Sequence, residues 1–201
     1  MTEVSPLAID LCCGRGGWCA GLLMEGWRVI GFDIVRPRTL PHGTLFVQQD
    51  VTTLSGAPWR GRVSLVVASP PCTEFSQMWR FARHRTPDPT AGMVLVRHCF
   101  RIAREVGAPY IIENVAGARP WFMPEFGPPT WQIGPYYFWG DQLVLQPMGD
   151  FRKRIWSYAR DKTGARRRPR DTHAATFVRD PAERARIPFA IARAVGAQFH
   201  P

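Results

Sequence analysis

The sequence lacks several features that would assign it to other classes of protein. No apolar run approaches the roughly 18 residues that a membrane-spanning helix requires. The first residues show no basic stretch followed by an apolar core, so we expect no signal peptide. The five cysteines are an odd number without a paired framework, which favours free thiols in a reducing cytoplasm over disulfides.

Acidic residues are also scarce. The chain has 16 Asp and Glu against 26 Lys and Arg, a formal net charge of +10. The excess is concentrated between residues 151 and 170, which contain nine basic residues and one acid, Asp161. Such a segment is typical of a surface that contacts a phosphate backbone. On charge alone, a solvated arm of the chain is an equally compatible interpretation.

Apolar runs and helical patterns alternate over the first half of the chain. This alternation predicts an α/β fold with a mostly parallel sheet covered on both faces. A length of 201 residues suits a single domain, residues 1–201. An amphipathic helix is predicted over 92–107, and strands over 6–12, 27–34, 43–50, 63–69 and 109–115.

Residues 116–185 differ in composition from the first half. They are rich in Pro, Gly and aromatic residues and then in basic residues, which predicts a loop-rich, basic region. Two further strands are expected over 136–140 and 154–159. A terminal helix is expected to begin near Asp180.

Glycines and acids follow the predicted strands where a ligand would bind. The stretch "DLCCGRGG" holds Asp10 and a glycine turn, and Asp33 and Asp50 end the next two strands. In open α/β sheets ligands bind beyond the carboxyl ends of the strands, where an acid after the second strand can bind ribose hydroxyls. The three strand ends together favour a nucleoside-containing cofactor.

Cys72 and Glu113 end the fourth and fifth predicted strands, in "SPPC" and "IIENV". A free cysteine is usually a small core residue, and a lone acid can cap a neighbouring loop. A thiol and a buried carboxyl at adjacent strand ends, however, form a coherent active site.

In the order of these motifs, the chain resembles the DNA cytosine-5 methyltransferases, above all the small members from phages or restriction–modification systems. The resemblance rests on "DLCCGRGG", "GFDI", "QQDV", "PPC", "ENV" and "IPFAIARAVGAQF". It implies a Rossmann-like class I methyltransferase fold with a seven-stranded sheet, and S-adenosylmethionine as the cofactor. The cofactor residues that it implies are Asp10, Cys12, Gly14, Gly16, Gly17, Trp18, Asp33, Ile34, Asp50, Val51 and Pro70.

The resemblance also implies a mechanism. The Cys72 thiolate would attack C6 of a flipped cytosine, Glu113 would hydrogen-bond its N3 and exocyclic amine, and Asn114 would steady the loop that holds Cys72. Methylation of C5 and elimination of Cys72 would complete turnover. The residues expected to contact DNA are Ser76, Met78, Trp79, Arg80, Arg83 and Arg85, and, on phosphates, Arg166, Arg167 and Arg168. Ordinary packing is an equal alternative for Trp79.

The chain departs from the family pattern in three places. Cys12 stands where the family usually has an aromatic residue. The late Gln-x-Arg-x-Arg element has no clean copy, and Arg152 or Arg154 of "DFRKRIW" is its best candidate. The target-recognition region is much reduced, which predicts a short or relaxed sequence preference.

Several alternatives remain at this point. One branch of the family methylates transfer RNA with the same residues, and a non-catalytic relative would bind nucleic acid without needing Cys72 or Glu113. A zinc site from Cys12, Cys13, Cys19 and His42 lacks paired C-x₂-C spacing, so we expect no metal. We expect a monomer in the cytoplasm of a bacterium or a phage-infected cell, acting on DNA and not on membranes.

Overall fold

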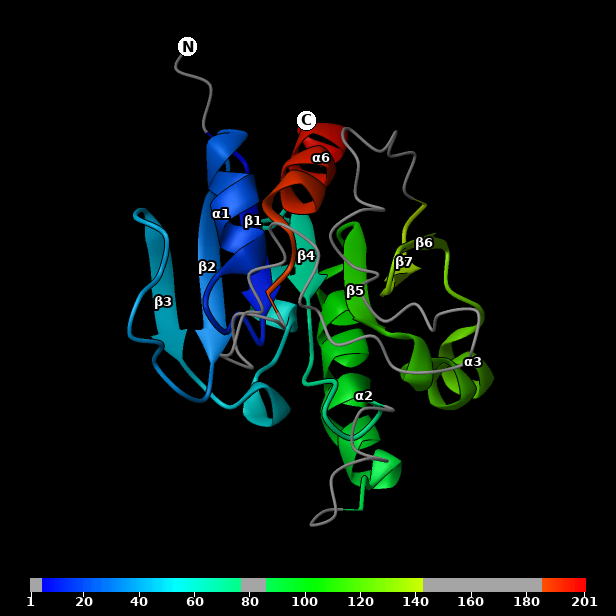
Figure 1. Cartoon of the computed structure of the whole chain (residues 1–201). Helices are drawn as coiled ribbons and strands as arrows, with labels where there is room; N and C mark the ends of the chain where they lie inside the picture. The colour runs from blue at the N-terminus through cyan, green and yellow to red at the C-terminus, as the bar shows by residue number, and fades with distance from the viewer. Residues whose placement is uncertain (1–4, 77–85, 143–185) are drawn as a thin grey trace, which may run out of the picture.

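The computed structural model describes residues 5–76, 86–142 and 186–201. In this part of the chain a seven-stranded sheet has the order β3-β2-β1-β4-β5-β7-β6 (Figure 1). Strand β7 is antiparallel to both of its neighbours, and β1 to β5 are parallel to one another. The strands are β1 (Leu7–Leu11), β2 (Arg28–Asp33), β3 (Thr44–Gln48), β4 (Leu65–Ala68), β5 (Tyr110–Val115), β6 (Trp131–Ile133) and β7 (Tyr136–Gly140).

Helices cover both faces of this sheet. On one face α1 and α6 lie side by side, and α2 and α3 lie on the other (Figure 1). The described helices are α1 (Gly17–Met24), α2 (Pro89–Val106), α3 (Arg119–Phe126) and α6 (Phe189–Phe199), with short 3₁₀ turns η1 (Val51–Thr53), η2 (Ala57–Trp59) and η4 (Ala116–Ala118). The predicted mostly parallel, doubly covered sheet is therefore confirmed.

The central strands are apolar throughout because both of their faces are buried. All four residues of β4 are buried, as are four of the five residues of β1. On one face Ile9 and Val66 join the core under α2, and on the other Ala8 and Leu65 join the core under α1 and α6. This is the near-continuous apolar pattern that a parallel sheet requires.

Helix α6 packs against α1 at very short range. Gly21 of α1 lies against Ala192 of α6 so closely that any side chain at position 21 would collide with it. Trp27 follows α1, and its indole Nε1 donates a 3.0 Å hydrogen bond to the carbonyl of Gly196. These contacts bring the end of the chain next to the glycine turn that precedes α1.

The prediction of a terminal helix beginning near Asp180 was wrong in its start. Residues 186–188 are not helical, and α6 begins at Phe189 after Pro188. Proline has no N–H and disfavours the helical conformation of the residue before it, so Pro188 marks the boundary. Residues 154–159, predicted as a strand, lie outside the described residues.

Residues 116–142 are more regular than the composition suggested. They form η4, α3 and the β6–β7 hairpin, and the predicted strand over 136–140 is confirmed as β7. Pro120 lies in the first turn of α3, where its missing N–H costs nothing. Stacking of Phe126 on Phe100 at 3.7 Å between centroids then fixes α3 against α2.

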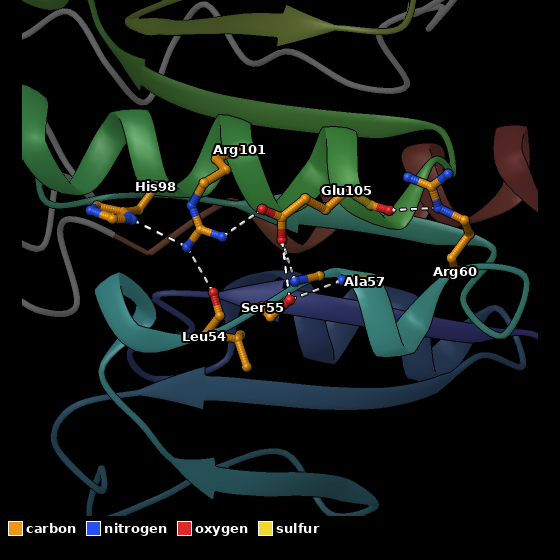
Figure 2. A network of polar contacts seen from close by, with 8 residues as sticks. Leu54, Ser55, Ala57, Arg60, His98, Arg101 and Glu105 are labelled. Atoms are coloured by element: carbon orange, nitrogen blue, oxygen red, sulfur yellow. Dashed lines mark hydrogen bonds and ion pairs between the residues drawn. The ribbon is translucent and has the colours of Figure 1, made fainter.

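A polar network attaches the segment between β3 and β4 to α2 (Figure 2). Arg101 donates to the carbonyl of Leu54 and to Glu105 Oε1, each at 2.7 Å. Glu105 Oε2 in turn accepts from the backbone N–H of Gly56 at 2.7 Å. Arg60 Nε donates to the carbonyl of Glu105 at 3.0 Å. These side chains stabilise the packing of the segment between β3 and β4 against α2.

Candidate active site

A cavity of about 630 Å³ opens where strands β1, β2 and β4 end. Its size is in the range of a small-molecule or cofactor site. Its walls come from the glycine turn, the loop after β2, the loop after β4 and the residues before α6. The lining residues are Cys12, Cys13, Gly14, Arg15, Gly17, Trp18, Asp33, Val35, Arg36, Pro37, Arg38, Ser69, Pro71, Cys72, Thr73, Arg186 and Ile187.

The glycine turn is fixed by Asp33. The backbone N–H of Gly14 donates to Asp33 Oδ2 at 2.9 Å, and that of Val35 donates to Oδ1 at 3.1 Å. Each carboxylate oxygen keeps a lone pair for a further donor, such as a ribose hydroxyl. Gly14 has φ +50°, and no atom lies within 4 Å of the position that a Cβ would occupy. A ligand can therefore approach the backbone of this turn closely.

The predicted cofactor residues are divided between the cavity and its surroundings. Cys12, Gly14, Gly17, Trp18 and Asp33 line it, whereas the others belong to neighbouring structure. The residues that do not line the cavity are Asp10, Gly16, Ile34, Asp50, Val51 and Pro70. Their part in cofactor binding stays a prediction.

Asp10 and Asp50 have contacts of their own within the fold. Asp10 is fully buried, and its Oδ2 accepts a hydrogen bond from Cys19 Sγ at 3.1 Å. Burial raises the pKa of Asp10 to about 7. Asp50 Oδ1 accepts from both the N–H and the hydroxyl of Thr52 at 2.8 Å, and these bonds lower the pKa of Asp50. Asp50 thereby caps the turn η1.

Cys72 lies half-buried on the wall of the cavity, in the loop after β4. The buried Asn114 donates from Nδ2 to the carbonyl of Pro70 at 3.0 Å, the contact expected of a residue that steadies this loop. Phe75 N–H donates to the carbonyl of Cys72 at 3.0 Å and closes the turn after it. Burial raises the pKa of Cys72, and the negative charge of Glu113 raises it further.

Glu113 ends a chain of polar contacts that begins on α1. Trp18 Nε1 donates to Ser69 Oγ at 2.9 Å, which directs the Ser69 hydroxyl hydrogen away from the indole. Burial raises the pKa of Glu113 to about 7, and a hydrogen bond from Ser69 opposes part of that rise. Tyr136 belongs to the same environment, since burial and then Glu113 raise its pKa to about 12.

The sequence did not point to Ser69 or Tyr136. Trp18 and Ser69 are 51 positions apart, and Tyr136 is on the antiparallel strand β7, so no local motif connects them with Glu113. The serine directly before "PPC" was the one signal available, because its side chain must lie at the end of the same strand as Cys72.

Many of the predicted nucleic-acid residues fall outside the described part of the chain. Ser76 is described and is partly buried. The predicted DNA-contacting residues outside the described part are Met78, Trp79, Arg80, Arg83, Arg85, Arg166, Arg167 and Arg168, and the catalytic candidates Arg152 and Arg154 lie outside it too. Their roles stay predictions.

Within residues 5–76, 86–142 and 186–201, no group of three or more His, Cys, Asp or Glu side chains is arranged to hold a metal ion. Cys12 Sγ lies 4.0 Å from Cys99 Sγ, on α2. Among the described helices, none combines the length and apolar character needed to cross a bilayer.

A family model for FtsJ-like methyltransferases matches residues 3–110, more than half of the chain. The chain belongs to this family. The predicted methyltransferase fold and the S-adenosylmethionine cofactor are confirmed at this level. The cavity suits that cofactor, since it offers an approachable glycine turn and an aspartate at the end of β2.

Solved structures resemble the chain more distantly. A protein named as a DNA modification methyltransferase, encoded within an E. coli prophage, has 20% identity and a TM-score of 0.48 over 69% of this chain and 47% of its own. The Dnmt2 methyltransferase of S. pombe has 21% identity and a TM-score of 0.40 over 57% of this chain and 38% of its own. The glycopeptide N-methyltransferase MtfA, solved with S-adenosylmethionine, has 17% identity and a TM-score of 0.37 over 57% and 50%.

The chain thus spans half or less of the length of these three structures. The comparison with curated proteins gives no match.

Proposed function

We propose that this protein transfers a methyl group from S-adenosylmethionine to C5 of cytosine in DNA, with Cys72 as the nucleophile. One observation carries the proposal. Cys72 follows β4, the buried Glu113 lies near the end of the adjacent parallel strand β5, and Cys72 lines the same cavity as the glycine turn. A thiol, an acid and a cofactor turn are the parts that a covalent methyl transfer to a pyrimidine requires.

When bound, S-adenosylmethionine would supply an electrophilic methyl group, and the glycine turn and Asp33 would hold it. Cys72, as the thiolate, forms a bond to C6 of cytosine and pushes electron density onto C5, where the methyl group is accepted. Loss of the C5 proton then returns an electron pair to the C5–C6 bond. The Sγ–C6 bond breaks and the thiolate leaves, so Cys72 is regenerated at the end of each turnover.

Glu113 has the protonation that this chemistry needs. With a pKa raised to about 7 by burial, it keeps its proton at a pH where an ordinary glutamate is ionised. The protonated carboxyl can donate to N3 of the cytosine and withdraw electrons from the ring, which favours attack at C6. Asn114 contributes by fixing the position of the Cys72 loop through Pro70.

The unbound enzyme keeps Cys72 mainly as a thiol. Burial and the charge of Glu113 both raise its pKa above the ordinary value, so the thiolate is disfavoured at neutral pH. A cysteine of this kind becomes reactive when the environment loses negative charge or gains positive charge. Protonation of Glu113 removes one of the two causes that suppress the thiolate.

The test is methyl transfer to two substrates. The purified protein is incubated with labelled S-adenosylmethionine and either unmethylated duplex DNA or transfer RNA, and the modified base is identified by mass spectrometry. We expect 5-methylcytosine in DNA, none with Cys72→Ser, and undiminished transfer with Cys99→Ser, a buried cysteine on α2. Transfer to transfer RNA alone, or to an atom other than C5, would overturn the proposal.

A further inference from the structure

Two arginines on the wall of the cavity have no part in the proposed chemistry. These are Arg36 and Arg38, the rim arginines, in the loop after β2. Asp33 is the one carboxylate among the described lining residues, and both of its oxygens already accept backbone hydrogen bonds.

Arg36 and Arg38 are exposed. Neither makes an ion pair with any residue in the part of the chain that the structure describes. The Arg36 guanidinium lies 4.7 Å from the centroid of the Phe46 ring, on β3. Stacking on a ring orients a guanidinium and leaves its N–H groups, which lie in its own plane, available to an acceptor.

Two arginines of α2 have structural roles and provide a comparison with Arg36 and Arg38. Arg97 binds both carboxylate oxygens of Glu125, and Arg101 binds Glu105 and the carbonyl of Leu54. Those guanidiniums are therefore used by the fold. Arg36 and Arg38 have no such carboxylate partners among the described residues, although they lie beside the reactive site.

The cofactor does not account for this charge. S-adenosylmethionine carries a sulfonium and an ammonium group against a single carboxylate, so its own net charge is positive. Arg36 and Arg38 carry the same sign of charge, so this cofactor is not the ligand that they favour. Two neighbouring guanidiniums suit a polyanion, and arginine is the residue best fitted to bind phosphate oxygens in pairs.

We propose that Arg36 and Arg38 bind backbone phosphates of the duplex DNA substrate beside the cavity that Cys72 lines. This inference rests on the proposed function, since it assumes that DNA lies over the cavity. Phosphate contacts fix the position and direction of a duplex without reading its sequence. They would let the catalytic domain itself hold DNA although its target-recognition region is reduced.

The experiment measures how the binding of a fluorescein-labelled DNA duplex depends on salt. The variants are Arg36→Gln/Arg38→Gln and the charge-matched control Arg97→Gln/Arg104→Gln, which removes the same charge from the face of α2. Each phosphate contact contributes about −0.9 to the slope of log affinity against log salt, so the rim variant should lower the magnitude of the slope by about 2. Its loss of affinity between roughly 50 and 200 mM salt should then be about tenfold smaller than that of the wild type.

The outcomes separate this inference from the proposed function. A lower slope for the rim variant, with the control close to wild type, supports the inference. It is overturned if the rim variant keeps the wild-type slope, or if both variants lower the slope equally. It is also overturned if the rim variant loses affinity for S-adenosylhomocysteine in calorimetry while its DNA slope is unchanged. The proposed function is judged separately, by whether the wild type forms 5-methylcytosine.

Discussion

Asp10 and Glu113 are buried carboxyl groups in the same sheet, and burial raises the pKa of each to about 7. Their surroundings differ. Asp10 is in the interior of β1 beneath α1, where Cys19 is its hydrogen-bond donor. Glu113 is near the end of β5, where it is linked through Ser69 to Trp18 and next to the loop of Cys72. Two carboxyls with the same raised pKa therefore lie in different surroundings. Their neighbouring residues determine which of the two can contact a substrate.

The largest expected difference between the two is in activity. Glu113→Gln removes the proton that the mechanism donates to cytosine, and general acid catalysis of this kind is worth about 10²–10⁴-fold in rate. Asp10 does not line the cavity, so kcat of Asp10→Asn at saturating S-adenosylmethionine should stay within a few fold of the wild type, and its predicted part in cofactor binding would appear as a raised KM for the cofactor. The measurement is kcat for methyl transfer to duplex DNA by each variant. Equal losses in the two variants would show that Glu113 has no greater role in methyl transfer than Asp10.

The free energy of unfolding should also depend on these carboxyls, because each destabilises the folded state when it ionises. A folded pKa near 7 against 3.8 for the unfolded chain means that the folded protein binds more protons between these values. The stability from Asp10 is therefore fully present below about pH 4 and is lost as pH rises through 7, a change of about 4 kcal/mol. Asp10→Asn should flatten the fall in Tm between about pH 4 and pH 7, where the folded protein binds the extra proton.

The control for that experiment is Asp50→Asn. Asp50 caps η1, and its pKa is lowered, so its contribution has the opposite sign: it is present above the ordinary pKa of an aspartate and is lost as pH falls. This variant should lower Tm near neutral pH and leave the fall toward alkaline pH unchanged. A Tm profile of Asp10→Asn that follows the wild type would show that Asp10 is already ionised in the folded protein.

The smallest expected effect is a shift in the pH dependence of kcat. It comes from the hydrogen-bonded contacts that link Trp18 and Ser69 to Glu113. The Ser69 hydrogen bond lowers the pKa of Glu113, so Ser69→Ala should raise it and keep the acid form to higher pH. The alkaline limb of the pH–kcat profile should move to higher pH. Trp18→Phe removes the donor that orients Ser69 and should move the limb in the same direction, by less.

Trp27→Phe is the matched control for Trp18→Phe. Trp27 is equally buried in the same core, but its indole N–H donates to the carbonyl of Gly196, away from Glu113. Trp27→Phe should therefore lower the free energy of unfolding without moving the alkaline limb of the pH–kcat profile. If Ser69→Ala, Trp18→Phe and Trp27→Phe all shift the alkaline limb equally, the shift reflects loosened packing. The hydrogen bonds of Trp18 and Ser69 then have no role in positioning Glu113.

The sequence predicted the parallel part of the sheet well because strands buried on both faces carry continuous apolar runs. The runs around Leu7, Val29, Val66 and Ile111 are all strands in the structure. The start of α6 was misjudged because an acid at Asp180 resembles a helix cap, whereas Pro188 sets the real boundary. Helix α3 was missed because it contains Pro120 in its first turn and Pro124 in its interior, and proline usually marks a loop or the end of a helix.

For the candidate site, the sequence located the strand ends but not the contacts between them. The positions of Cys72 and Asp33 on the cavity wall follow from the rule that parallel strands end at one edge. The burial of Asp10 beside Cys19 was not predictable, because it depends on how α1 packs over β1. That Arg36 and Arg38 have no carboxylate partner among the described residues also depends on tertiary structure, because the sequence does not show which acids lie near them.

The most direct test of the central claim is covalent capture of Cys72. Duplex DNA that carries 5-fluorocytosine cannot lose a proton from C5, so after methyl transfer the Sγ–C6 bond cannot break. With Cys72 as the nucleophile, we expect a stable adduct of enzyme and DNA that requires S-adenosylmethionine, maps to Cys72 by peptide mass spectrometry and is absent in Cys72→Ser. An adduct on another residue, or methylated DNA from the wild type with no adduct on the fluorinated duplex, would contradict it.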